Sequence, residues 1–263
     1  MTPEELLALG LRVDVDGALA TITLDRPEVR NAQTPQMWRA LATVGSTLPD
    51  SVQVVVVQGA GDTFSSGLDR RMLDPSGAGD DQETVVGLLR SSDEVISATI
   101  DDYQQGFTFL RDPRFVSIAK VQGHAVGAGF QLALSCDLRV VADDVKFSMK
   151  ESALGLVPDL TGTKPLVEAV GYSRALEICA TARTVGAEEA VRIGLALSAH
   201  PAEEIDAVVQ TLVESLTAPM PGVVSETKKL LQGADDRDLD DQRRLEREAQ
   251  TRRFRAVAAA LGG

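Results

Sequence analysis

The chain has 263 residues, enough for one large domain or for a core with a small appendage. Its hydrophobic content of 44% and charged content of 25% are typical of a globular protein and exclude a disordered one. A net charge of -13 leaves no basic surface for a nucleic-acid backbone or an anionic membrane. The acidic N-terminus MTPEELLALG lacks the basic start and long apolar stretch of a signal peptide, so we expect a cytoplasmic location.

The sequence shows no cluster of histidines and cysteines at the spacing of a metal site. The two histidines, His124 and His200, are far apart, so no metal site is predicted. The two cysteines, Cys136 and Cys179, lie in apolar segments and are expected to be reduced thiols of the core.

The first third of the chain alternates strands with turns. The segments 11–15 and 18–24 alternate apolar and polar residues around Asp16-Gly17, which predicts a hairpin. Thr34 and Pro35 are typical of a helix start, and the apolar residues that follow have helical spacing. That apolar stripe consists of Met37, Leu41, Val44 and Leu48.

The remaining elements follow from apolar runs and turn residues. The uniformly apolar segment 52–58 predicts a strand buried on both faces. We predict a loop at 75–84, helix from there to 110, a buried strand at 117–126, a helix at 128–135, a strand at 138–142, mainly helices from 163 onward, and an amphipathic charged helix at 235–260.

Two turns place small residues directly after buried strands. Thr63 to Asp69 follows the first of these strands, and Gly123 to Gly129 follows the second. Small residues let a ligand approach the backbone, and one N–H from each turn could form an oxyanion hole. Glycines at turns also have purely structural roles, and this alternative stays open. The spacing matches neither a dinucleotide fingerprint nor a phosphate-binding loop.

Both turns belong to a set of stretches that match one family in order along the chain: 22–32, 64–69, 123–133 with Cys136-Asp137, 147–158 and 187–195. Together they resemble the enoyl-CoA hydratase/isomerase (crotonase) superfamily. The resemblance implies an α/β fold: a crotonase-like spiral of ββα units with two roughly perpendicular sheets. It implies a core at 1–198 with the thioester site, followed by a C-terminal helical trimerisation region at 199–263. The protein is therefore expected to be a homotrimer or a hexamer.

The resemblance also implies which residues would bind an acyl-CoA thioester. The backbone amides of Leu68 and Ala128 would hold the enolate oxygen. The coenzyme A moiety enters as part of the substrate, and no separate cofactor is expected. Its predicted contacts are Arg30, Ala32, Ser66, Leu68, Gly127 and Gln131, with Arg71 as a candidate partner for its phosphates.

The acidic residues near the expected enolate decide the reaction class. Typical hydratases of this family carry two glutamates, but here one of the two positions holds Gln131 and the other holds Glu151. An amide does not exchange protons near neutral pH, so Gln131 is expected to have a structural or substrate-shaping role. Asp159 occupies a position that is an acid in some isomerase branches; a helix N-cap is the competing interpretation.

The sequence thus predicts isomerisation of an enoyl-CoA double bond, with Glu151 as the base and Glu151 or Asp159 as the acid. Three alternatives stay open: an enoyl-CoA hydratase, a member that binds acyl-CoA without turnover, and an interaction protein that uses its C-terminal helix. The segment 75–110 is expected to determine which acyl group is accepted.

Overall fold

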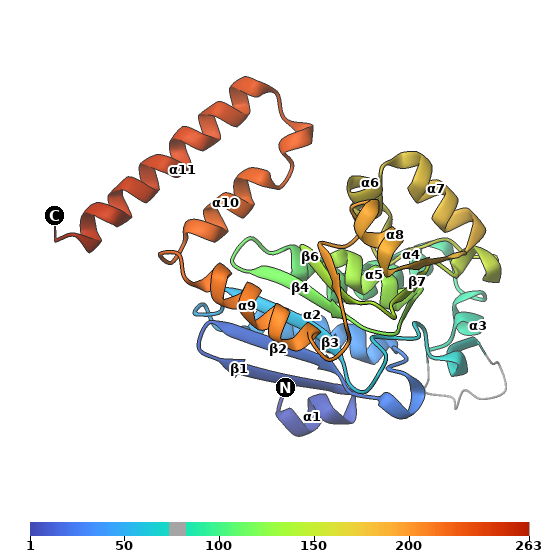
Figure 1. The fold of residues 1–263 in the computed structure, drawn as a ribbon. Helices are drawn as coiled ribbons and strands as arrows, with labels where there is room; N and C mark the ends of the chain where they lie inside the picture. Colours follow the sequence, from blue (N-terminus) through green and yellow to red (C-terminus); the bar gives the residue numbers. More distant parts are fainter. Residues whose placement is uncertain (74–82, 263) are drawn as a thin grey trace.

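The protein forms two β-sheets packed among helices in a computed structural model that describes residues 1–73 and 83–262 (Figure 1). The strands are β1 (Leu11–Asp16), β2 (Leu19–Leu24), β3 (Val54–Gly59), β4 (Val116–Val121), β5 (His124–Val126), β6 (Leu138–Ala142), β7 (Lys146–Ser148), β8 (Thr184–Gly186) and β9 (Ser198–His200). The α-helices are α1 (Pro3–Ala8), α2 (Pro35–Thr47), α3 (Val85–Leu88), α4 (Asp93–Thr108), α5 (Ala128–Ser135), α6 (Thr163–Val170), α7 (Tyr172–Thr181), α8 (Ala187–Arg192), α9 (Ile205–Thr217), α10 (Val223–Leu231) and α11 (Leu239–Ala260).

The larger sheet has the strand order β1-β2-β3-β4-β6-β9. In this sheet, as far as the described residues show, β1 and β2 form the one antiparallel pair, with Leu11 opposite Leu24 and Asp16 opposite Leu19. The turn between them needs the positive φ of Gly17, which glycine adopts without strain. This confirms the predicted hairpin. The smaller sheet has the order β5-β7-β8.

Helices cover both faces of the larger sheet, and this explains its uniformly apolar strands. Val55 and Val57 of β3 belong to the main core cluster, which includes residues of α2. Val54 and Val56 point to the opposite face and join a second cluster that includes residues of α9. Because successive side chains of a strand alternate between faces, both sets must be apolar. The prediction of a doubly buried strand is confirmed.

Helix α2 starts at the predicted residues. The Thr34 side chain accepts a hydrogen bond from the N–H of Met37 at 3.3 Å, and Pro35 is the first helical residue. The buried face of α2 includes Met37, Leu41 and Val44, as the helical spacing predicted. Helices α3 and α4 confirm the helical prediction that extends to residue 110. Most of the predicted loop at 75–84 lies outside the described residues.

The single strand predicted at 117–126 is wrong. The chain forms β4 in the larger sheet, bends at Gly123, and continues as β5 in the smaller sheet. Gly123 has φ +57°, and a Cβ on it would collide with the backbone carbonyl of Asp62. Both segments are equally apolar, so hydrophobicity alone does not reveal the change of sheet. The helix predicted at 128–135 and the strand predicted at 138–142 are confirmed as α5 and β6.

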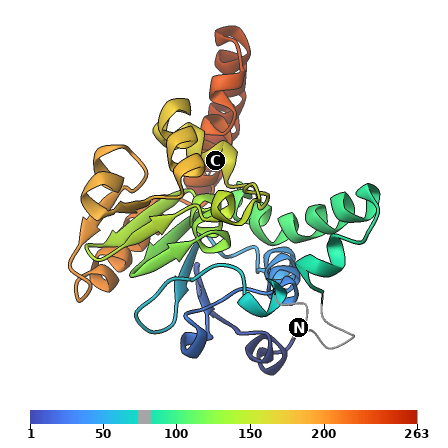
Figure 2. The same ribbon diagram turned by 90° about the vertical axis from the view of Figure 1, so that its right-hand side faces the viewer.

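The C-terminal part divides into a helix on the sheet and a projecting pair of helices. Helix α9 packs on the larger sheet, whereas α10 and α11 extend away from it (Figures 1 and 2). We call α10 and α11 together the arm. The predicted helix at 235–260 is confirmed, although α11 begins only after Asp238, whose side chain caps it. The division at residue 198 stays a prediction. Among residues 1–73 and 83–262, no helix is long and apolar enough to cross a membrane.

Candidate active site

The two glycine-containing turns lie against each other. The N–H of Ser65 donates to the carbonyl of His124 at 2.8 Å, and the N–H of Val126 donates back to the carbonyl of Ser65 at 3.0 Å. Gly67 has φ +86°, and a Cβ on it would collide with the Val126 carbonyl and lie 3.5 Å from the nitrogen of Ala128. Glycine at 67 therefore allows the backbone of the first turn to approach the start of α5.

The amides of Leu68 and Ala128 are left out of the backbone pairing around them. Gln33 and Leu68 form a parallel bridge in which the N–H of Gln33 bonds Gly67 and the N–H of Asp69 bonds Gln33. This pairing does not use the N–H of Leu68. Ala128 is the first residue of α5, where an N–H has no carbonyl partner within the helix. Both amides can therefore donate to an oxygen of a ligand.

The segments predicted to contact coenzyme A, Arg30–Ala32 and Ser66–Leu68, lie side by side. The N–H of Ser66 donates to the carbonyl of Arg30 at 2.8 Å. Arg30 is left-handed, with φ 54°, and its side chain is exposed. Ala32 is buried, so this residue presents little more than backbone. The two segments thus form one continuous strip of backbone beside the turn.

Sequence reasoning did not single out Asn31, which holds this strip in place. Its side chain is fully buried and donates to the carbonyl of Thr63 at 2.7 Å. Its side-chain oxygen accepts from the N–H of Arg26 at 3.0 Å. Asn31 also has φ 54°, a conformation that asparagine adopts more readily than most residues. An asparagine directly after a proline-containing turn could have indicated this role.

Arg71 is largely exposed, but its guanidinium is paired. It donates to both carboxylate oxygens of Asp69, at 3.1 and 2.8 Å, and Arg26 donates to the same carboxylate at 3.0 Å. Hydrogen bonds from Arg71 hold the pKa of Asp69 far below its ordinary value. Two guanidinium groups and one carboxylate leave one net positive charge near the turn. The predicted contact between Arg71 and a phosphate stays a prediction.

Glu151 lies at the start of a short 3-10 helix, Glu151–Leu154, beside the first residues of α5. Its Oε1 accepts a hydrogen bond from the Nε2 of Gln131 at 2.7 Å. A Cβ on Gly127 would lie 3.4 Å from the same oxygen. The other oxygen, Oε2, is buried and has no hydrogen-bond partner in the part of the chain that the structure describes. Burial raises the pKa of Glu151, hydrogen bonds oppose this effect, and the nearby Asp159 raises the pKa further.

Asp159 does not cap the helix that follows it. Helix α6 begins at Thr163, and its N-cap residue is Gly162, which makes no side-chain cap. The N–H groups of Leu160 and Gly162 instead donate to the Oε1 of Gln131. The N-cap interpretation is therefore wrong, because a side chain of α5 has taken over the local donors. Burial raises the pKa of Asp159.

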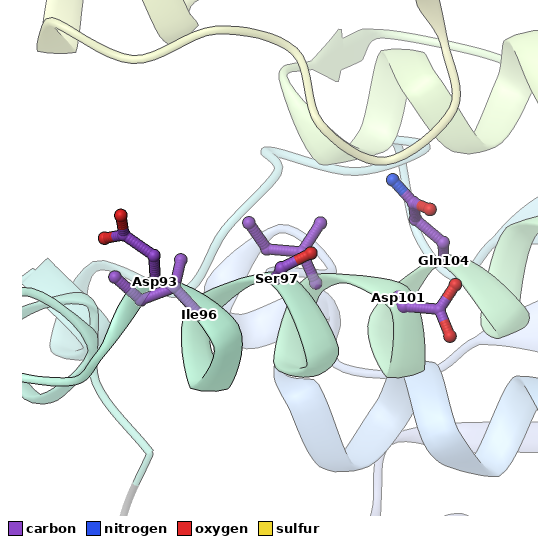
Figure 3. Close-up of a pocket in the computed structure, with 6 residues that line it drawn as sticks. Asp93, Ile96, Ser97, Asp101 and Gln104 are labelled. Carbon is purple, nitrogen blue, oxygen red and sulfur yellow. The ribbon is translucent and has the colours of Figure 1, made fainter.

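A groove of about 430 Å³ runs along the side of α4 near this site (Figure 3). Gln104 lies at one end and donates to the carbonyl of Asp159 at 2.6 Å. Figure 3 shows Asp93 and Gln104 pointing to the same side of α4. One end of the groove thus lies next to the backbone of Asp159. Its lining residues are Asp93, Ile96, Ser97, Ile100, Asp101 and Gln104.

Three other side chains of nucleophilic type, Ser65, Cys136 and Cys179, differ in their surroundings. The hydroxyl of Ser65 donates to the carbonyl of Asn31 at 2.7 Å, so it is not directed at His124. Cys136 and Cys179 are free thiols. Cys136 is buried, as predicted, and burial raises the pKa of its thiol to about 12. Cys179 is only partly buried.

Comparison with known proteins gives consistent matches over most of the chain. The enoyl-CoA hydratase/isomerase family profile matches residues 14–259. A peroxisomal Δ3,5-Δ2,4-dienoyl-CoA isomerase from Arabidopsis thaliana is 31% identical over 241 residues, which cover 88% of this chain and 84% of the relative. A Mycobacterium tuberculosis protein named as an enoyl-CoA hydratase is 30% identical, covering 78% of this chain and 72% of its own.

Solved structures match the whole fold. A Thermobifida fusca protein described as an enoyl-CoA hydratase, crystallised with acetoacetyl-CoA, is 50% identical with a TM-score of 0.93. The match covers 97% of this chain and 98% of that one. The fold class predicted from the sequence is confirmed by this match.

Proposed function

Because the chain belongs to the enoyl-CoA hydratase/isomerase (crotonase) family, we propose that it moves a carbon–carbon double bond in an enoyl-CoA thioester. The main observation in support is the buried Glu151 carboxyl, with its unpaired Oε2, beside the first residues of α5. Asp159 provides a second acid close enough to influence Glu151. The dienoyl-CoA isomerase relative from Arabidopsis thaliana also supports an isomerase.

The thioester would bind across the two turns. Its coenzyme A part lies along the backbone strip of Arg30–Ala32 and Ser66–Leu68, and its carbonyl oxygen accepts from the amides of Leu68 and Ala128. The Thermobifida fusca relative was crystallised with an acyl-CoA, which supports this substrate class. The charge near Arg71 would attract the phosphates of coenzyme A. The acyl group enters the groove along α4.

The reaction needs one proton taken and one returned. For a 3-enoyl thioester, Glu151 removes a proton from C2, and the electron pair spreads into a dienolate with its charge on the thioester oxygen. Each amide donor contributes roughly 2.7–4 kcal/mol to stabilising that charge. Glu151 or Asp159 then returns a proton to C4, which gives the 2-enoyl thioester. The thioester itself makes the C2 proton acidic, so this sequence of steps uses no separate cofactor.

Proton NMR in D₂O on 2-enoyl-CoA and 3-enoyl-CoA tests the proposal. We expect double-bond migration with deuterium uptake in the wild type. A positioned base typically contributes about 10²–10⁴-fold, so Glu151→Gln should lower turnover by at least about 100-fold. Near-wild-type activity of this variant would contradict the role of Glu151. Tight binding of acyl-CoA without any proton exchange would instead identify a non-catalytic member.

A hydratase is the second candidate, because the Thermobifida fusca structure and the Mycobacterium tuberculosis relative both carry that name. In this case Gln131 would orient a water molecule and Glu151 would perform both proton transfers. The same NMR experiment separates the two reactions. Formation of 3-hydroxyacyl-CoA from 2-enoyl-CoA would establish hydration, whereas migration without water addition supports isomerisation.

The arm supports a proposal on assembly, namely a homotrimer or a pair of trimers. Phe254, Val257 and Leu261, at the end of α11 and directly after it, are three and four residues apart and all exposed, and such a grouped apolar surface typically marks an interaction site. Leu239 is 74% exposed, Phe254 66% and Leu261 82%. Light scattering after size-exclusion chromatography should give three or six times the mass of one chain. A monomer at micromolar concentration would contradict this proposal.

A further inference from the structure

Gln131 links Glu151 to the turn that contains Asp159. It lies on α5, and its side chain is fully buried. Its oxygen accepts from the N–H groups of Leu160 and Gly162, at 2.8 and 3.3 Å. Its NH₂ group donates to Oε1 of Glu151 at 2.7 Å. One amide therefore contacts both the Glu151 carboxyl and the turn that contains Asp159.

The orientation of this amide is fixed by its neighbours. If the amide of Gln131 were flipped, its NH₂ group would face the N–H groups of Leu160 and Gly162, and donors would oppose donors. The backbone also leaves little room for another arrangement, since a Cβ on Gly162 would lie 2.7 Å from the Cγ of Gln131. The NH₂ group must therefore point at Glu151.

From this geometry we infer that Gln131 is a positioning residue that fixes Oε1 of Glu151 and so assigns proton transfer to Oε2. Oε2 is buried, and no group among residues 1–73 and 83–262 forms a hydrogen bond with it. The inference rests on the proposed function for its chemical meaning. It explains what an amide does at a position where typical hydratases carry an acid. A neutral donor holds Glu151 without competing with it for protons.

The other ionisable groups near Glu151 are few. Asp159 faces it from the turn before α6, and Cys179 faces it from α7. The neighbouring Lys150 points elsewhere, since its ammonium donates to the carbonyl of Ala182 at 2.6 Å. The hydrogen bond from Gln131 stabilises the ionised form of Glu151, whereas burial and Asp159 favour the neutral form.

Gln131→Met tests the inference by removing the donor while keeping the side-chain length. Losing a hydrogen bond to a charged group should lower kcat by about 10- to 100-fold, while KM changes little. The acid limb of the kcat/KM profile should move to higher pH, because Glu151 loses the group that favours its ionised form. A purely structural defect would lower activity without moving this limb.

Two further variants are compared with Gln131→Met: Gln131→Glu, which places a second acid beside Glu151, and Gln210→Met, which serves as the matched control. In Gln131→Glu the backbone donors would hold one new oxygen, and the other would face Glu151, so the acid limb should move upward further than in Gln131→Met. Gln210 also donates its amide to a glutamate, Glu214, at 3.0 Å, but on the exposed face of α9. Gln210→Met should leave the profile unchanged.

Carbon-13 NMR titration of glutamate carboxyls gives a readout that does not need turnover. The Glu151 signal is identified by its loss in Glu151→Gln, and in Gln131→Met it should titrate at higher pH. If the wild type moves no double bond but this titration shifts, the proposed function fails and the positioning role stands. If double-bond migration occurs but neither the acid limb nor the titration moves in Gln131→Met, the positioning role is wrong.

Discussion

The site and the arm are held by different kinds of interaction. Around the site, hydrogen bonds join residues far apart in sequence, such as Gln131 with Leu160 and Ser66 with Arg30. In α11 the only buried residue is Ala249, and ion pairs such as Arg244 with Asp241 and Glu248 lie within one helical turn. Exposed pairs of this kind are worth only about 0.3–0.5 kcal/mol each. The fold therefore fixes the geometry of the site, whereas the position of the arm depends on what it packs against.

The largest effect on stability is expected from a substitution at the junction, where α10 of the arm meets the residues next to β4. Lys228 of α10 has a buried ammonium that donates to Asp137 at 2.7 Å and to the carbonyls of Asp112 and Phe115. Breaking a buried pair typically costs about 3–5 kcal/mol, so Lys228→Met should lower the free energy of unfolding by this amount.

Urea unfolding measures this loss, and Lys229→Met is the matched control. Lys229 is half-exposed and pairs with Glu226 three residues earlier, so its loss should change the free energy of unfolding by less than about 0.5 kcal/mol. Equal effects of the two substitutions would show that the junction is not what attaches the arm.

A second test disturbs the contact between the two turns. Gly67→Ala forces a left-handed alanine, at about 1–2 kcal/mol, and presses its Cβ into the Val126 carbonyl, at about 1–3 kcal/mol more. Gly17 also has a positive φ, but a Cβ added there would have no atom within 4 Å. Gly17→Ala should therefore lose only the stability that a left-handed alanine costs, without the cost of a clash. Denaturant titration and turnover of both variants would check this, and a loss of activity in Gly17→Ala would contradict it.

The smallest expected effect is a gain in stability. Burial raises the pKa of Glu151 in the folded protein, so its ionised form is disfavoured there relative to the unfolded chain. Glu151→Gln should therefore be more stable than the wild type at pH 7, and the difference should vanish below the ordinary glutamate pKa, where both side chains are neutral. Thermal unfolding of the wild type and Glu151→Gln at pH 7 and pH 4 measures the stability difference at each pH. A variant that is less stable than the wild type at pH 7 would show that the ionised Glu151 does not destabilise the fold.

Elements that depend on nearby residues could be predicted from the sequence. The hairpin at Asp16-Gly17, the start of α2 at Thr34 and helix α5 are set by local turn and capping chemistry. The two turns could be located from the small residues that follow two apolar strands, and the family resemblance pointed to Glu151 as the candidate base. The change of sheet at Gly123 was missed because the backbone that Gly123 approaches closely, that of Asp62, lies about sixty residues earlier in the sequence.

The role of Gln131 needed the structure for a similar reason. Its partners, Leu160 and Gly162, are 29 and 31 residues away, and no local pattern indicates that their N–H groups bond a side chain of α5. Distant hydrogen bonds of this kind leave no periodic trace in a sequence.

The candidate site combines three segments that leave the ribosome one after another. They are the turn at Gly67, the start of α5 at Ala128, and the segment from Glu151 to Gly162. A ribosome must therefore release more than half of the chain before the two amides and the two acids can meet. A protein cleaved between Ala128 and Glu151 would leave each fragment with only part of the site. Any activity of such fragments would require their re-association.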